Sequence, residues 1–204
     1  MNPRVEAGKN KPIGIIVLAA GASRRMKEPK QLLRFQGRTL LRRAAQTALE
    51  SIYHPVVVVL GANFEPSKAE IEDLAVEIVF NKNWQCGLSS SIKAGVENLL
   101  QIAPDAAAVV ITLADQPLVT ALHLNLFAEK FEQSRNAVIA AEYNKTLGVP
   151  ALFAREIFND LGKLPGDKGA KPLIEKHRPS LSTIALPEAA FDIDTPQDYA
   201  SLKQ

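Results

Sequence analysis

Short, uninterrupted runs of apolar residues alternate along this chain with segments of helical periodicity. The clearest runs are IGIIVLAA at residues 13–20, PVVVVL at 55–60 and AAVVITL at 107–113. A strand buried on both faces reads as such a continuous run, which is typical of parallel sheets covered by helices. Strands that alternate with helices place those helices on both faces of the sheet. The sequence therefore predicts an α/β, Rossmann-like three-layer fold with a mostly parallel central sheet.

The remaining segments fit this alternation. Further strands are predicted at 76–80, 137–141, 149–153 and 181–186, the middle two flanking a turn at 143–148. Helices are predicted at 37–51, 66–75, 89–100, 120–133, 154–161, 170–177 and 196–202. Thr39 is the expected N-cap of the first of these helices, because its hydroxyl can accept a hydrogen bond from a free N–H of the first turn.

Composition narrows the class of protein. The 204 residues suit one domain, and 47% hydrophobic residues can supply a full core. The net charge of only +2 disfavours a nucleic-acid-binding or membrane-surface protein. A single cysteine excludes an internal disulfide and, with three scattered histidines, disfavours a zinc site. We expect a flexible segment at 1–12, a single domain at 13–204, no targeting segment and a cytoplasmic location.

A loop of small and basic residues follows the first predicted strand. Residues 19–23 are Ala-Ala-Gly-Ala-Ser, and four cations follow them, namely Arg24, Arg25, Lys27 and Lys30. Small side chains let a nucleotide approach backbone N–H groups, and the cations can neutralise its phosphates. In open α/β sheets, ligands bind beyond the carboxyl ends of the strands. The loop has neither a Walker A nor a G-x-G-x-x-G pattern, so a solvated basic loop is the alternative.

The loop sequence LAAGASRRMKEPKQLL resembles the LAAG-x-S-x-RMG-x-x-K-x-LL signature of MobA-like nucleotidyltransferases, and most of all their molybdenum cofactor cytidylyltransferase branch. The resemblance covers nearly the whole chain from Ile13. It implies the nucleotide-diphospho-sugar transferase-like fold. Lys27 departs from the pattern, which usually has glycine there, and Val149 stands where relatives often have a polar residue or histidine. The other segments that agree, in order, are GLSSSIKAGV at 87–96, LADQPLV at 113–119, GVPALF at 148–153, LPGDKGAKPLI at 164–174 and DIDTPQDY at 192–199.

The resemblance implies roles for individual residues. Arg25 and Lys30 fall where the superfamily's triphosphate-binding cations lie, and with Asp115 they form the expected catalytic set. Asp115 and Asp194 fall where Mg²⁺ ligands lie, and carboxylates are hard oxygen ligands that suit this ion. The full set of expected nucleotide-binding residues is Ala19, Ala20, Gly21, Ser23, Arg25, Lys30, Gly87 and Ser91. The expected acceptor-binding residues are Gly166, Asp167, Gly169 and Lys171.

Each assignment has a structural alternative. Asp115 can cap the turn that follows its strand. The serines at 89–91 can cap a helix, and the segment at 166–171 also reads as a tight turn before a helix. Asp192 shares a face with Asp194 in an extended segment, either behind the metal ligands or exposed to solvent.

These residues suit phosphoryl chemistry without a general base. An acceptor phosphate is already anionic, so it needs alignment and charge neutralisation to attack a triphosphate. The resemblance implies transfer of CMP from CTP to molybdopterin with Mg²⁺ as cofactor, giving molybdopterin cytosine dinucleotide and pyrophosphate. A guanylyltransferase using GTP, a transferase for a sugar or alcohol phosphate, and a non-catalytic cofactor-delivery protein are the alternatives. The implied protein partner is a molybdenum hydroxylase or its maturation chaperone.

Overall fold

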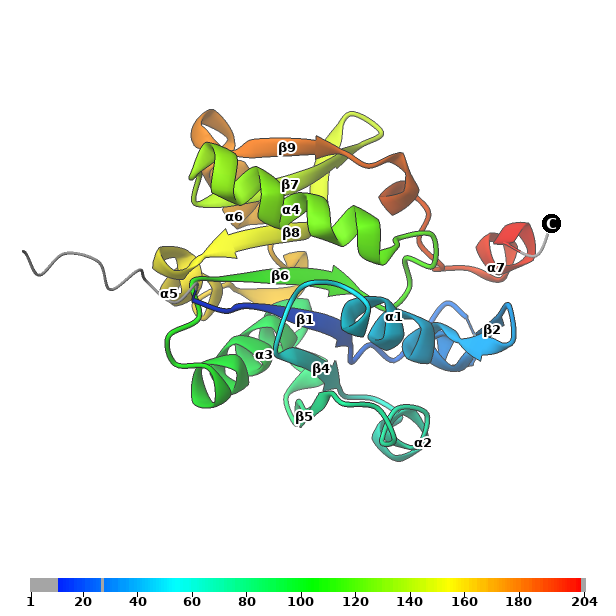
Figure 1. The fold of residues 1–204 in the computed structure, drawn as a ribbon. Helices are drawn as coiled ribbons and strands as arrows, with labels where there is room; N and C mark the ends of the chain where they lie inside the picture. The colour runs from blue at the N-terminus through cyan, green and yellow to red at the C-terminus, as the bar shows by residue number, and fades with distance from the viewer. Residues whose placement is uncertain (1–10, 27, 203–204) are drawn as a thin grey trace, which may run out of the picture.

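The three long apolar runs form adjacent strands at the centre of one sheet in the computed structural model, which describes residues 11–26 and 28–202. The order of the seven strands is β5-β4-β1-β6-β8-β7-β9 (Figure 1). Only β8 runs antiparallel to its neighbours, β6 and β7, so the sheet is mostly parallel, as predicted. The strands are β1 (Ile13–Ala19), β4 (Val56–Leu60), β5 (Glu77–Phe80), β6 (Ala108–Leu113), β7 (Val138–Tyr143), β8 (Thr146–Ala154) and β9 (Ser182–Ala185).

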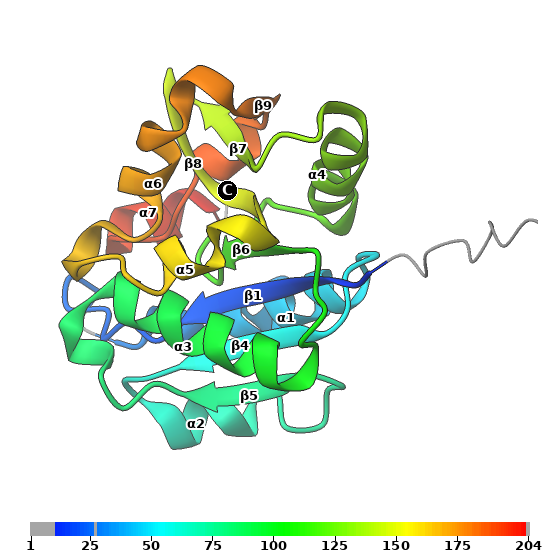
Figure 2. The ribbon, with the colours of Figure 1, turned by 90° about the vertical axis from the view of Figure 1, so that its left-hand side faces the viewer.

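Side chains of β1 alternate between two cores, one on each face of the sheet. Ile15 and Val17 pack with side chains of α1 (Leu40–Leu49) and α4 (Ala121–Ser134). Ile16 and Leu18 pack on the other face with α3 (Leu88–Ile102), α5 (Phe158–Leu161) and α6 (Lys171–Lys176). Figure 2 shows α5 and α6 on the side of the sheet opposite to α4. α2 (Phe64–Ala69) lies beside the β4–β5 edge. The predicted three-layer α/β fold is therefore confirmed.

A third, smaller core gathers segments that are far apart in the sequence. It joins the basic loop, the hairpin β2 (Arg34–Phe35) and β3 (Arg38–Thr39), the start of α1 and the segment that leads into α7 (Pro196–Leu202). The Tyr199 hydroxyl also donates to the carbonyl of Arg34 at 2.7 Å. This core holds the C-terminal segment against the loop that follows β1. Its fully enclosed members are Met26, Leu33, Leu40 and Ile193, and Phe35, Phe191, Tyr199 and Leu202 pack around them.

Several element boundaries differ from the prediction. The first helix begins at Leu40 rather than at 37, because residues 34–39 form the hairpin, which turns at Gln36 and Gly37 with φ of 50° and 81°. Thr39 is its N-cap, as predicted, and accepts a hydrogen bond from the N–H of Arg42 at 3.2 Å. β7 and β8 extend into the predicted turn, leaving only two residues between them. The helix predicted at 66–75 covers Phe64–Ala69.

Part of the predicted flexible segment, residues 1–10, lies outside the described residues, and so does Lys27. Within 11–26 and 28–202, no helix combines the length and apolarity that crossing a lipid bilayer requires.

Two leucines of α4 provide a matched test of the core assignment. Leu124 is 1% exposed and Leu122 is 77% exposed. Leu124→Ala should lower the free energy of unfolding by about 2–5 kcal/mol, because it leaves a cavity between α4 and the sheet. Leu122→Ala should change it by less than about 0.5 kcal/mol. Urea denaturation followed by circular dichroism measures both, and equal losses would contradict the packing of this helix.

Candidate active site

A cavity of about 560 Å³ opens at the carboxyl ends of β1 and β6. Its volume is typical of a site for a small molecule, and its place is where ligands bind in open α/β sheets. The helix start at Gly87–Leu88 and the segment around Asp194 close its sides. The residues predicted from the sequence that line it are Ala19, Ala20, Gly21, Arg25, Lys30, Gly87, Ser91, Asp115, Asp167 and Asp194.

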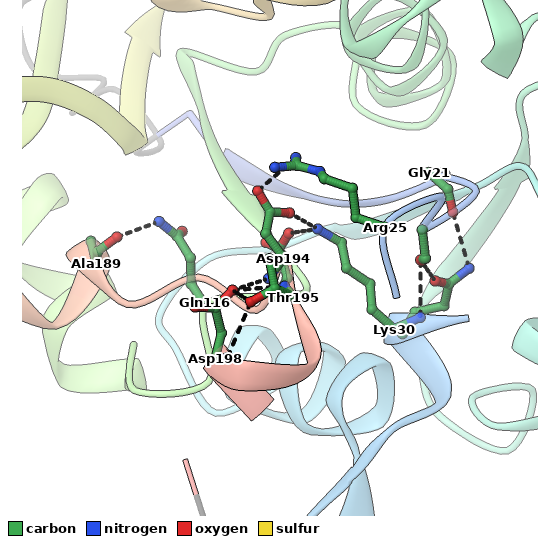
Figure 3. A network of polar contacts seen from close by, with 11 residues as sticks. Gly21, Arg25, Lys30, Gln116, Ala189, Asp194, Thr195 and Asp198 are labelled. Carbon is green, nitrogen blue, oxygen red and sulfur yellow. Dashed lines mark hydrogen bonds and ion pairs between the residues drawn. The ribbon is translucent and has the colours of Figure 1, made fainter. Parts of the chain in front are cut away.

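Lys30 lies between the two predicted metal ligands. Its Nζ forms an ion pair with Oδ2 of Asp115 and donates to Oδ1 of Asp194 at 2.8 Å. Nη2 of Arg25 donates to the other oxygen of Asp194, Oδ2, at 2.9 Å (Figure 3). The structure thus brings together the catalytic and metal-binding residues expected from the sequence, although Lys30 and Asp194 are 164 positions apart.

The charges in this cluster perturb one another. Burial opposes the charged form of Lys30, but the two carboxylates outweigh it and raise the pKa of the lysine above its ordinary value. Burial likewise opposes ionisation of Asp194, yet Lys30 and Arg25 hold the pKa of this carboxyl below its usual range. Burial raises the pKa of Asp192, and the neighbouring charges of Asp115 and Asp194 raise it further. Asp192 also lines the cavity, although it is exposed to solvent, so it belongs to the rim of the site.

The loop after β1 is fastened by its own side chains. Ser23 adopts a positive φ of 54°, and its hydroxyl accepts from the N–H of Lys30 at 2.9 Å and donates to Oε1 of Gln31 at 3.1 Å. Nε2 of Gln31 reaches the carbonyls of Gly21 and Ala62, both at 3.4 Å. Ser23 does not line the cavity. Its hydroxyl fixes the backbone from which Lys30 projects, and direct contact of Ser23 with a nucleotide stays a prediction.

Asp194 is positioned by the turn that begins α7. Oδ2 of Asp198 accepts from the N–H of Asp194 at 3.1 Å and from the N–H of Thr195 at 2.7 Å (Figure 3). The N–H of Asp198 in turn donates to the hydroxyl of Thr195 at 3.3 Å, which makes a reciprocal cap. The N–H of buried Ile193 donates to the carbonyl of Asp115 at 3.0 Å and so ties the two carboxylate-bearing segments together.

Gln116 follows β6 and connects the end of this strand to β8 and to the segment around Ala189. Its Nε2 donates to the carbonyl of Ala189 at 2.9 Å (Figure 3). It also donates to the carbonyl of Val149 at 3.1 Å. Sequence reasoning missed Gln116, Gln31 and Asp198 as residues that position the site. Only Asp198 carried a signal that could have been read, because Thr195 and Asp198 have the spacing of a capping box.

The acidic oxygens fit a hard divalent cation. Oδ1 of Asp115 is buried and has no hydrogen-bond partner within residues 11–26 and 28–202, and Asp194 presents both of its oxygens nearby. Among the described residues, no three His, Cys, Asp or Glu side chains gather into a metal-binding group. Mg²⁺ is commonly held by one or two carboxylates with substrate phosphates and water completing its shell. The two carboxylates therefore fit an ion whose remaining ligands come from a triphosphate and water.

Gly87 and Ser91 form part of the cavity wall at the start of α3. Gly87 has a φ of 94°, and a Cβ at this position would collide with Oδ1 of Asp167, so only glycine fits. Ser91 is buried and its hydroxyl accepts from Nδ2 of Asn81 at 3.0 Å. Gly87, not one of the serines, is the N-cap of α3. Contact of Gly87 and Ser91 with a nucleobase stays a prediction.

The predicted acceptor-binding residues separate into three positions. Asp167 lines the main cavity. Lys171 lines a smaller, mainly apolar cavity of about 180 Å³, which shares Leu18 and Leu88 with the main one. Gly166 and Gly169 line neither cavity but supply the positive φ angles, 63° and 56°, of the turn between them. The two cavities adjoin, which suits a site for two substrates.

Comparison with curated proteins finds relatives whose names describe different functions. Over 108 residues, which are 50% of this chain and 48% of the relative, the chain is 41% identical to nicotine blue oxidoreductase of Paenarthrobacter nicotinovorans. It is 28% identical to purine catabolism protein PucB of Bacillus subtilis, over 93% of this chain and 95% of the relative. It is 23% identical to the molybdenum cofactor cytidylyltransferase of Escherichia coli, over 94% and 96%.

Solved structures show the same architecture. Rv0371c of Mycobacterium tuberculosis superposes with a TM-score of 0.81 at 26% identity, over 96% of this chain and 99% of that one. The same protein in complex with manganese gives 0.78 at 27%, over 94% and 98%. Its homologue from Mycobacterium sp. strain JC1 gives 0.79 at 32% identity, over 93% and 94%.

The sequence profile of the MobA-like NTP transferase domain matches residues 15–181, which include the basic loop, the serines at 89–91 and Asp115. The family expected from the motifs is thereby confirmed: this chain belongs to the MobA-like NTP transferase family.

Proposed function

We propose that this protein is a Mg²⁺-dependent cytidylyltransferase that transfers CMP from CTP to the phosphate of a molybdopterin-type acceptor. The observation that carries the proposal is the meeting of Arg25, Lys30, Asp115 and Asp194 at the mouth of one cavity. Membership of a nucleotidyltransferase family supports the reaction class. The Escherichia coli relative of nearly equal length supports the choice of nucleotide and acceptor.

The transfer needs alignment more than acid–base chemistry. A phosphate oxygen of the acceptor forms a bond to the α-phosphorus, and the bond from that phosphorus to the bridging oxygen of the β-phosphate breaks. Pyrophosphate leaves with the electron pair of that bond. Arg25 and Lys30 offer positive charge where the leaving group gains negative charge. Asp115 and Asp194 would hold Mg²⁺, which supplies charge neutralisation to the phosphates when bound.

The two adjoining cavities support a division of labour. The main cavity has the basic loop and the start of α3 on its walls, which suits the nucleotide. The smaller one is lined by aliphatic side chains with Lys168 and Lys171 among them, which suits a flat, polar-edged acceptor. Ala20 in LAAG adds a methyl group where the guanylyl branch more often has glycine, and we attribute a preference for the smaller pyrimidine base to it. GTP remains the alternative nucleotide.

The relative with 41% identity gives a second candidate, a redox function, because its name is that of an oxidoreductase. The match covers only half of each chain. Against this candidate, the loop after β1 has a single glycine, Gly21, where a dinucleotide-binding fingerprint has three. A shift in melting temperature with NADH or NADPH, in the absence of one with any nucleoside triphosphate, would favour the redox function.

A delivery role is compatible with this reaction. We propose a molybdenum hydroxylase, or a chaperone that matures it, as the recipient of the product, and a cytoplasmic location for the transfer. Co-purification of the product with a hydroxylase from a strain that makes both proteins would test this.

Nucleotide preference can be measured as thermal stabilisation. At about 100 times its dissociation constant, a ligand adds about 2.7 kcal/mol, which for a chain of this size raises the melting temperature by roughly 5–10 °C. We expect this shift with CTP and Mg²⁺, a smaller one with GTP, ATP or UTP, and a smaller one with CTP alone. A larger shift with GTP would reassign the protein to the guanylyl branch.

Turnover tests the carboxylate assignment. Asp115→Asn should lower the rate of pyrophosphate release by at least about 100-fold, because it removes the charge that would hold Mg²⁺ beside the phosphates. Asp73→Asn is the matched control, since Asp73 forms an ion pair with Arg42 outside the cavity at 2.7 Å and should leave the rate unchanged. Unchanged turnover in the Asp115 variant would refute the assignment.

A further inference from the structure

The ammonium group of Lys30 contacts both carboxylates, Asp115 and Asp194, that would hold a cation. It pairs with Oδ2 of Asp115 and lies 2.8 Å from Oδ1 of Asp194. The side chains of these three residues are only 20%, 14% and 32% exposed, so water screens their charges weakly. The contact is therefore a partly enclosed three-membered ion cluster rather than a surface salt bridge.

A divalent cation bound to these two carboxylates would lie beside the ammonium group of Lys30 and be repelled by it. Mg²⁺ binds carboxylate oxygens at about 2.0–2.1 Å, which would place a double positive charge beside the ammonium group. Like charges at such separations repel strongly where screening is weak. Removing Lys30 from the cluster, by contrast, would take away the cation that pairs with Asp115 and Asp194 and that also acts on the adjacent Asp192. The side chain of Arg25 is 71% exposed and forms its ion pair with Asp194, so it compensates the other two carboxylates poorly.

The backbone of Lys30 is held in place, whereas its side chain is flexible. The N–H of Lys30 is held by the Ser23 hydroxyl at 2.9 Å, and the residue begins a short 3₁₀ turn, Lys30–Leu32. Its side chain is an unbranched, flexible stem that ends in a mobile point charge. The carboxylates and the small-residue loop at Gly21 line the same cavity. The ammonium group can therefore leave the carboxylates for a phosphate bound at that loop.

We propose that Lys30 is an internal competitor for the cation site: it holds Asp115 and Asp194 against free divalent ions and yields them to an ion that arrives with a triphosphate. The second half of this inference rests on the proposed nucleotidyl transfer, because a triphosphate is the anion that would draw Lys30 away. The first half depends only on the charges and contacts of the cluster. Lys30 thereby makes metal binding follow nucleotide binding.

Binding of Mn²⁺ alone, with no nucleotide added, tests the competition. Lys30→Gln removes the positive charge at similar length and should tighten Mn²⁺ binding by about tenfold or more, measured as loss of the free-ion signal in electron paramagnetic resonance. Lys30→Arg keeps the charge and should bind Mn²⁺ as weakly as the wild type. Adding Asp115→Asn to Lys30→Gln should abolish the gain, because one of the two carboxylates is then neutral.

Lys176→Gln is the matched control. Lys176 forms an exposed ion pair with Asp160 at 2.9 Å, away from both cavities, and its replacement should leave Mn²⁺ affinity unchanged. Circular dichroism checks that each variant is folded, and Lys30→Ala provides a second charge-removing variant.

The inference is overturned if neither Lys30→Gln nor Lys30→Ala binds Mn²⁺ more tightly than the wild type. A parallel assay of CMP transfer by the wild type separates the two proposals. Tighter Mn²⁺ binding without transfer would support the competition and refute the proposed function. Transfer without tighter binding would do the reverse.

Discussion

Burial of β1 on both faces is the constraint on which the rest of this structure depends. Ile15 and Val17 fill one core, and Ile16 and Leu18 fill the other. With β4 on one side and β6 on the other, both parallel to it, β1 has no free edge. The strand ends at the carboxyl edge of the sheet, where small and basic residues follow it in the sequence. The position of the basic loop is thus a consequence of how the core is packed.

The elements that the sequence predicts well are those whose pattern is local. The strands of the sheet centre are uninterrupted apolar runs, so their place inside a parallel sheet follows from the local sequence pattern. The start of α1 differs from the prediction, because the apolar spacing of 37–51 hides the second half of a hairpin that spans 34–39. The turn at Gln36 and Gly37 depends on positive φ angles, which hydrophobic periodicity does not report.

The site was predictable in its parts but not in its contacts. Motif resemblance identified Lys30, Asp115 and Asp194, yet no local pattern indicates that one ammonium group bridges both carboxylates. The residues that hold these three in place, Gln31, Gln116 and Asp198, act through backbone carbonyls and N–H groups of distant segments. Such bonds depend on tertiary arrangement, and a single sequence carries little trace of them.

The separation of 164 positions between Lys30 and Asp194 also has a consequence in time. A ribosome adds about 5–20 residues per second, so Asp194 is made roughly 8–33 s after Lys30. Throughout that interval the small core around Met26 lacks Ile193, and the basic loop has no C-terminal segment to pack against. The residues of the sheet centre are therefore all made before the last member of the charged cluster is made.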